Sequence, residues 1–325
     1  MRPERRVHVL RLRLQLVGVL GCAALLAQGG VGVMARSIAT APTTIAELHY
    51  GDEHRVRAWN GVQAWNDYDP GDLRWHVFVR SGGRISAPPA IPAGDGRLRV
   101  DVGPGPDGRP ALVYLSCADV CQVVVSALDG SRAQPVPGST GATAATIWGA
   151  RVAWVRGGKT VLTRRLDGGA TRRVPGPPRG YDVGELELQG SRLAFIAFKG
   201  AEVGQTEVRM QSLRGGRQLL VAAMSFGSAN QAFQGPSWAG GKLFFYMSRP
   251  SRRLAGPYRY DPRSGRYAKA PDAGALTGFA MEDDGRRAFE VLDASTIVGP
   301  EPEDVTQLRL TGPLRFTPTR PPLPR

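Results

Sequence analysis

The stretch Gly149-Ala-Arg-Val-Ala-Trp154 joins a glycine turn to a short apolar strand that carries an aromatic residue. The pattern occurs six times, 40 to 50 residues apart, and its aromatic residues are Trp65, Tyr114, Trp154, Phe195, Phe245 and Phe289. A unit repeated at this period is typical of a β-propeller, in which each repeat forms one four-stranded blade. The sequence therefore predicts an all-β propeller with six blades. Five or seven blades are the alternatives, because the first and last repeats are the least regular.

The third repeat shows the predicted blade most clearly. Its inner strand is expected at 143–148, its second at 151–156 and its third at 160–166, before the turn Asp167-Gly168-Gly169 and an outer strand at 171–175. The second strands are mostly apolar, as expected of strands that are covered on both faces. The recurring aromatics are therefore predicted to pack between blades. To close the ring, either 44–48 or 55–59 should pair with 308–316.

Residues 1–41 have the three-part layout of a secretory signal: a basic start, the uncharged apolar run 14–35, and a small polar end. A cleaved signal peptide, an uncleaved anchor that crosses the membrane through 14–35, and lipidation at Cys22 are the three interpretations. The propeller is expected over 42–316, followed by a Pro-rich disordered tail over 317–325.

Export agrees with the two remaining cysteines. Cys117 and Cys121 flank a three-residue turn between two strongly β-prone runs. In an oxidising compartment such a pair is most simply a disulfide across the end of a hairpin.

The formal net charge is +14 over 325 residues, from 42 basic and 28 acidic side chains. The arginines are scattered, often in pairs at strand ends, whereas nucleic-acid binders gather their charge on a stripe or helix. We expect no nucleic-acid partner and a monomeric protein.

Several segments resemble a known family. The run from Val100 to Tyr114, the cysteines that follow it, and the Leu-Asp-Gly-Gly turn at 166–169 look like the propeller of TolB-like and WD-repeat-like bacterial envelope proteins. The chain is similar in particular to secreted propellers of high-GC actinobacteria. The resemblance covers about residues 45 to 315, and it implies an exported, non-catalytic interaction domain. The N-terminal domain of TolB itself has no counterpart here.

Catalytic signals are sparse. No histidine occurs after His76, and no hydrolase elbow, phosphate-binding loop or dinucleotide fingerprint is present. The run 66–72 is acidic, and its Asp67, Asp69 and Asp72 are a weak calcium candidate because carboxylates are hard oxygen ligands. A solvated turn is the simpler interpretation, so we predict no catalytic residue, metal or cofactor.

The sequence thus favours a secreted or envelope-associated scaffold that binds a protein or a glycan. One alternative is an enzyme that acts on envelope polysaccharide through carboxylates near the channel, for which Asp101, Asp182, Glu185 and Glu187 are candidates. The other alternative is a calcium-stabilised structural module.

Overall fold

A computed structural model describes residues 41–49, 55–96, 98–200, 204–226, 233–248, 254–271, 276–293 and 306–323. The predictions for the signal segment, the membrane anchor over 14–35 and Cys22 lie outside these residues. Within the described ranges, no helix has the length and apolar character to cross a membrane. All described strands belong to one compact unit, Ala39–Arg325.

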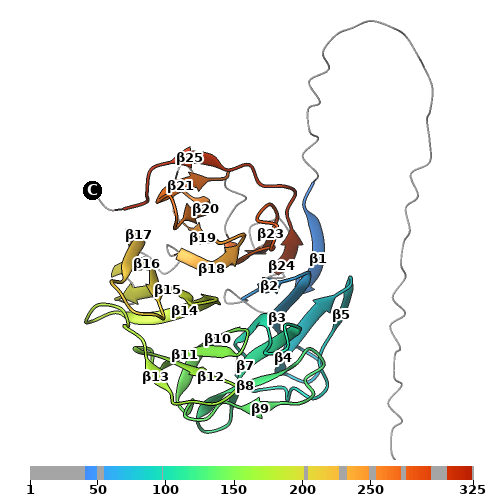
Figure 1. The fold of residues 1–325 in the computed structure, drawn as a ribbon. Helices are drawn as coiled ribbons and strands as arrows, with labels where there is room; N and C mark the ends of the chain where they lie inside the picture. Colours follow the sequence, from blue (N-terminus) through green and yellow to red (C-terminus); the bar gives the residue numbers. More distant parts are fainter. Residues whose placement is uncertain are drawn as a thin grey trace, which may run out of the picture. The chain divides into compact units, whose positions relative to one another are not determined.

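The strands of this unit form six antiparallel sheets arranged as the six predicted blades, which Figure 1 shows around one centre. Blades 1 to 3 each follow the chain from the inner strand outward: β2 (Arg57–Trp59), β3 (Val62–Asp69), β4 (Arg74–Ser81) and β5 (Arg84–Ser86); β6 (Val100–Pro104), β7 (Pro110–Cys117), β8 (Cys121–Ala127) and β9 (Gln134–Pro135); β10 (Ala142–Trp148), β11 (Arg151–Arg156), β12 (Thr160–Arg165) and β13 (Arg172–Arg173). Blades 4 and 5 do the same: β14 (Asp182–Gln189), β15 (Arg192–Lys199), β16 (Gly204–Ser212) and β17 (Leu219–Phe226); β18 (Phe233–Ala239), β19 (Lys242–Met247), β20 (Gly256–Asp261) and β21 (Arg266–Lys269).

The two ends of the propeller share blade 6, which closes the ring. Its order is β22 (Leu276–Met281), β23 (Ala288–Asp293), β24 (Thr306–Leu310) and then β1 (Thr43–Leu48) from the start of the chain. Leu48 is opposite Thr306 and Thr43 is opposite Leu310. The first of the two predicted closing segments, 44–48, therefore makes the closure, and the second provides the inner strand of blade 1.

The C-terminal segment differs from the predicted disordered tail. Thr317–Thr319 form β25, a fifth strand on blade 5 in which Pro318 is opposite Ala268 of β21. Further on, the carbonyl oxygen of Pro322 accepts a hydrogen bond of 2.9 Å from the amide of Ala223 in β17. Proline is compatible with a strand at the edge of a sheet, because there its missing N–H faces solvent. The segment thus covers the outer edges of two neighbouring blades.

The core consists of separate clusters at the junctions between blades. Tyr114 packs with β3 and β4, Trp154 with β7 and β8, and Phe195 with β11 and β12. Phe245 packs with β15 and β16, while Trp65 and Phe289 share the junction of blades 6 and 1. All six aromatic side chains are almost completely buried. Burial on both faces explains why the second strands read as apolar runs instead of alternating ones.

Adjacent inner strands approach one another closely enough to require glycine. A Cβ atom on Gly235 of β18 would lie 1.9 Å from the carbonyl oxygen of Phe279 in β22. Gly103 of β6 has the same relation to Ile147 of β10, at 2.3 Å. These positions set how tightly the blades pack around the centre.

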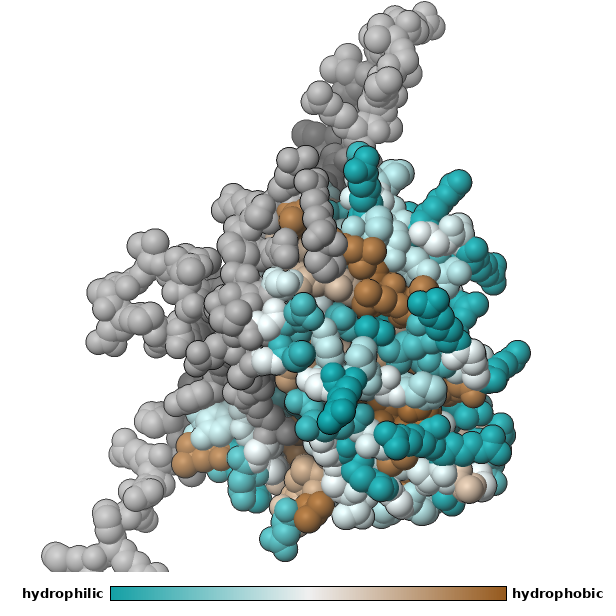
Figure 2. Space-filling model, turned by 90° about the vertical axis from the view of Figure 1, so that its left-hand side faces the viewer, coloured by the Kyte–Doolittle hydropathy of each residue, from teal (hydrophilic) through white to brown (hydrophobic). Residues whose placement is uncertain are grey.

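The outer surface carries dispersed charge. Figure 2 views the ring from the left-hand side of Figure 1, and hydrophilic side chains cover much of the visible described surface between small hydrophobic areas. Leu219 and Leu220 of β17 are among the exposed apolar residues. Scattered apolar residues of this kind are normal for a soluble surface.

Candidate functional site

Polar side chains of the inner strands join neighbouring blades near the centre. A carboxylate oxygen of Asp101 accepts a hydrogen bond from the amide of Ile147 (3.2 Å), and the Thr146 hydroxyl accepts one from Leu188 (3.1 Å). Ser237 repeats this contact with Met281 at 3.1 Å. These hydrogen bonds satisfy buried backbone donors, so the side chains that make them have a structural role.

Glu187 departs from this pattern. Glu187 occupies the same position relative to the following hairpin turn as Thr146 and Ser237 do in their blades. Its Oε2 atom, however, is buried without a hydrogen-bond partner in the described residues. That oxygen lies 4.0 Å from Nε of Arg57. The carboxylate therefore faces the centre of the ring instead of bracing the next blade.

Arg57 is the hub of a charged cluster at the centre. Its side chain, on blade 1, reaches the opposite side of the ring and donates a hydrogen bond of 3.0 Å to Glu185 on blade 4. Its Nε atom also lies 3.9 Å from Asp101. Buried charges need such partners, because each loses its hydration.

Two further arginines reach the same point of blade 4. The pairing of β14 shifts register between Val183 and Glu185, so Gly184 bulges from the ladder. Its carbonyl oxygen accepts hydrogen bonds of 3.0 Å from both Arg55 and Arg99. A bulge frees a backbone group from the ladder, and here it provides the acceptor that holds two guanidinium groups.

This arrangement separates the pKa values of the two glutamates. Burial opposes ionisation of Glu185, but the positive charges of Arg55, Arg57 and Arg99 outweigh it and lower its pKa. Burial and the neighbouring Asp101 carboxylate raise the pKa of Glu187 well above its ordinary value, despite Arg57. Burial also raises the pKa of Asp101. Three of the four carboxylates named from the sequence thus gather at the centre.

The fourth carboxylate, Asp182, does not join them. Its side chain is partly exposed at the start of β14, 3.9 Å from Nζ of Lys159. The inner strand places only part of its length at the centre, which the sequence pattern does not reveal.

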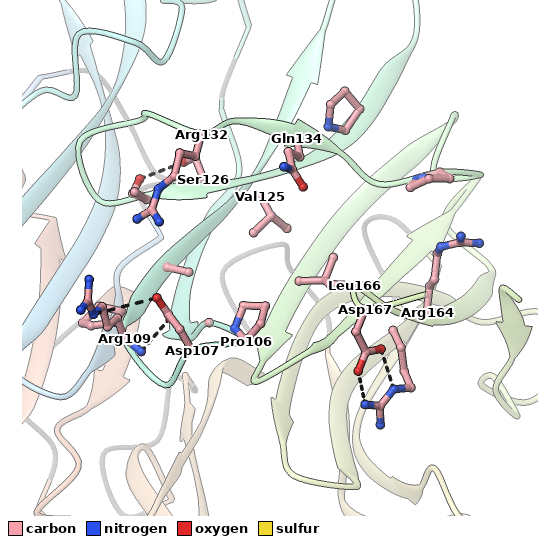
Figure 3. A pocket seen from close by; sticks show the side chains of 17 residues that line it. Pro106, Asp107, Arg109, Val125, Ser126, Arg132, Gln134, Arg164, Leu166 and Asp167 are labelled. Atoms are coloured by element: carbon pink, nitrogen blue, oxygen red, sulfur yellow. Dashed lines mark hydrogen bonds and ion pairs between the residues drawn. The ribbon is translucent and has the colours of Figure 1, made fainter. Parts of the chain in front are cut away.

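A groove of about 520 Å³ lies between blades 2 and 3, on the face that carries the turns after their first and third strands. Its floor contains prolines and aliphatic side chains, including Pro106, Val125 and Leu166 (Figure 3). The volume is in the range of ligand-binding pockets.

Four arginines line this groove, and they are of two kinds. Arg109 lies 4.0 Å from Asp107, and Arg165 pairs with Asp167. The side chains of Arg132 and Arg164 have no hydrogen bond or ion pair with any described residue, although the charge of Arg132 contributes to lowering the pKa of Asp129. Figure 3 shows these two arginines at opposite ends of the groove, with Val125 and Leu166 between them.

The three calcium candidates do not lie together. Asp69 and Asp72 lie with His76 on the β3–β4 hairpin, with possible ligand atoms within 4.8 Å of one another. Asp67 is instead buried and accepts a hydrogen bond of 2.8 Å from the amide of His49, beyond the end of β1. Asp69 and Asp72 are exposed and His76 is partly buried. Hydrogen bonds within the hairpin already use an oxygen of each aspartate: Asp69 accepts from Gly71 and Asp72 from Arg74.

The predicted disulfide is confirmed. Cys117 and Cys121 are directly opposite each other at the end of the β7–β8 hairpin and are bonded. The bond closes the hairpin end of blade 2 and takes both thiols out of any metal-binding role.

Sequence reasoning missed Arg57 as the hub and the groove with Arg132 and Arg164. The sequence places Arg57 only within a possible closing strand, and the two groove arginines belong to different repeats. A signal for Arg57 was present, since a charged residue in a short apolar inner strand calls for a buried partner.

The sequence matches no protein-family model and no curated protein. In structure the chain is similar to TolB from Acinetobacter baumannii, with a TM-score of 0.53, 13% identity, and coverage of 78% of this chain and 65% of that one. It is also similar to a chain of the mitotic checkpoint complex (TM-score 0.48, 11% identity, 89% and 99% covered). A puromycin-hydrolyzing peptidase of Mycobacterium tuberculosis is similar too (0.49, 13%, 84% and 53%). The match to TolB agrees with the β-propeller fold, and the chain spans 65% of the TolB chain's length.

Proposed function

We propose that this protein is an exported, non-catalytic propeller that binds a protein or glycan partner in the bacterial cell envelope. The observation that carries the proposal is the groove between blades 2 and 3. It has the size of a ligand pocket and contains two arginine side chains that form no ion pair with a described residue. The central carboxylates, by contrast, face Arg57. Binding sites on propellers are expected in the loops and hollows of a rigid ring.

Export is part of this proposal. The Cys117–Cys121 disulfide is compatible with an oxidising compartment, and the layout of residues 1–41 supports secretion. Fractionation of cells that express the full chain tests it. We expect the protein outside the cytoplasm, and recovery in the cytoplasm with free thiols would contradict export.

Partner capture tests the binding role. Purified full-length protein, immobilised and incubated with envelope extract, should retain a specific partner. The Arg132→Ala/Arg164→Ala variant is compared with Arg172→Ala/Arg173→Ala, which removes two exposed arginines of β13 outside the groove. If the wild type captures no more than an unrelated propeller does, the proposed function is wrong.

A polysaccharide-acting enzyme is the second candidate, favoured by the opposite pKa shifts of Glu185 and Glu187. Two carboxyls held in different protonation states are the usual requirement for acid–base cleavage of glycosidic bonds. A screen on envelope glycans decides between the two functions. Activity that is lost in Glu187→Gln but retained in Asp182→Asn, which lies outside the central cluster, would establish the enzyme and replace the scaffold.

A further inference from the structure

The chemistry of the groove narrows the kind of partner it accepts, an inference that rests on the proposed function. We infer that the groove between blades 2 and 3 binds a carboxylate-bearing segment of a partner protein, in which aliphatic and acidic side chains alternate. The charge of the groove, its floor and its edge each favour this ligand.

The charge of the groove selects an anion. Arg165 is neutralised by Asp167, and Arg109 lies near Asp107, whereas Arg132 and Arg164 lack an ion pair among the described residues. Arg164 is partly buried at the end of β12, and Arg132 is exposed in the turn between β8 and β9. A guanidinium group binds a carboxylate through two parallel hydrogen bonds, which makes an arginine at each end suited to two acidic side chains.

The floor selects an aliphatic group between those charges. Val125 and Leu166 lie between the two arginines (Figure 3), and prolines such as Pro106 and Pro110 complete the surface. No tryptophan, tyrosine or phenylalanine is among the described residues that line the groove. Amphipathic rings suit a ligand that is apolar on one side and wet on the other, so this floor favours an aliphatic side chain over a sugar.

The edge of the groove excludes one way of binding a peptide. The amide of Val136 donates to Val123 of β8, so alternation along the strand turns the backbone of Pro135 away from β8, toward solvent. Proline has no N–H, and the next outward-facing residue, Pro137, is also a proline. The outward-facing backbone at Pro135 and Pro137 therefore offers no donors to an added strand. Recognition must come from side chains, which places the specificity in Arg132 and Arg164.

The fit of the groove to an acidic protein segment can be measured directly on the full-length protein. The probe is a fluorescein-labelled dodecapeptide of alternating leucine and glutamate, and binding is followed by fluorescence anisotropy. A peptide of alternating leucine and lysine controls for charge, and polygalacturonate represents an anionic glycan. The variants are Arg132→Ala/Arg164→Ala and the matched Arg172→Ala/Arg173→Ala, with thermal unfolding as the check on folding.

We expect the leucine–glutamate peptide to bind the wild type, to bind the groove variant at least about tenfold more weakly, and to bind the β13 variant with unchanged affinity. The lysine peptide should not bind, and added salt should weaken binding of the acidic peptide. Absence of binding to the acidic peptide, or equal losses in both variants, would overturn the assignment. Tighter binding of polygalacturonate with the same dependence on Arg132 and Arg164 would also overturn it, in favour of a glycan.

Failure of the groove assignment can be distinguished from failure of the proposed function by the capture experiment. If envelope extract yields a partner whose retention does not depend on Arg132 and Arg164, the groove assignment is wrong while the scaffold function stands. If no partner is retained at all, the proposed function itself is wrong.

Discussion

At the scale of single residues, the charge at the centre of the ring depends on Glu185 and Glu187, two positions apart on β14. The same strand places both near Arg57, but only Glu185 accepts a hydrogen bond from it. The positive charges of Arg55 and Arg99 further stabilise the ionised form of Glu185. Glu187 is left beside Asp101, a group of its own charge. One strand thus holds a stabilised anion and an acid whose ionisation is opposed.

Replacing Glu187 by glutamine should stabilise the protein at neutral and higher pH. The folded-state pKa of Glu187 lies above its ordinary value of 4.5, so between these values the folded protein holds a proton that the unfolded chain releases. Wild-type stability therefore falls as pH rises through this window, and Glu187→Gln removes the loss. Urea unfolding at several pH values from 4.5 upward measures the difference.

Glu185→Gln is the matched comparison, with the opposite expectation. Its lowered pKa contributes stability above its ordinary value of 4.5, and this is lost as pH falls through the folded-state value. Removing this carboxylate leaves Arg57 without its closest partner and should cost about 3–5 kcal/mol at pH 7. Equal destabilisation by both substitutions at every pH would refute the opposite roles.

Gly235→Ala should be far more damaging than Gly240→Ala. Both glycines have φ of +55°, so the cost of about 1–2 kcal/mol for a left-handed backbone is common to the two variants. Only at Gly235 does the added Cβ meet a backbone atom, 1.9 Å away. Thermal unfolding should show a modest loss for Gly240→Ala and a failure to fold, or a much larger loss, for Gly235→Ala. Similar melting temperatures would mean that the blades do not approach this closely.

Calcium removal should leave the melting temperature unchanged. Asp69 and Asp72 are exposed, and hydrogen bonds of their own hairpin already engage an oxygen of each, at 2.7 and 3.0 Å. Differential scanning calorimetry with and without chelator measures the effect. A clear decrease in chelator, abolished by Asp69→Asn/Asp72→Asn, would favour the calcium-stabilised module instead.

At the scale of elements, the C-terminal segment matters more than its composition suggests. Leu314 and Phe316 pack against the core at the junction of blades 5 and 6, and Arg259 lies over the ring of Phe316 at 5.0 Å. The strand β25 and Pro322 then cover the edges of blades 5 and 4. Uncovered strand edges invite pairing with other chains.

Deleting residues 317–325 should therefore lower stability and promote self-association, since it uncovers the edges of β21 and β17. Thermal unfolding and light scattering measure the two effects. The control is Arg320→Ala, which shortens one exposed side chain and leaves the backbone contacts in place. A truncated protein as stable and monodisperse as the wild type would show that the contacts of β25 are dispensable.

The elements also show how far the sequence could predict the structure. The glycine–aromatic repeat predicted the blades because each aromatic marks a second strand that must be buried on both sides. The need to complete the last blade predicted closure by either 44–48 or 55–59, and the structure shows that 44–48 makes it. The tail was misjudged on composition, because proline content argues against a central strand but not against an edge strand such as β25.

At the scale of the whole molecule, both candidate sites lie between repeats and not within them. Arg132 and Arg164 come from different blades and meet at one groove only when the blades pack side by side. Arg57 and Glu185 are separated by half the ring and join across its centre. Neither arrangement has a local sequence pattern, since each depends on distances that only the closed propeller sets. The carboxylates of the central cluster were therefore predictable from the sequence. Its hub Arg57 and the groove arginines Arg132 and Arg164 were not.

Photocrosslinking in living cells, with a photoreactive amino acid at Gln134 in the groove, shows whether a partner occupies the groove between blades 2 and 3. The matched position is Arg172 on β13, exposed on the neighbouring blade and outside the groove. We predict a discrete crosslinked partner protein from Gln134 and none from Arg172. Identical crosslinking from both positions, or a specific partner from Arg172 alone, would contradict the assignment of partner binding to the groove between blades 2 and 3.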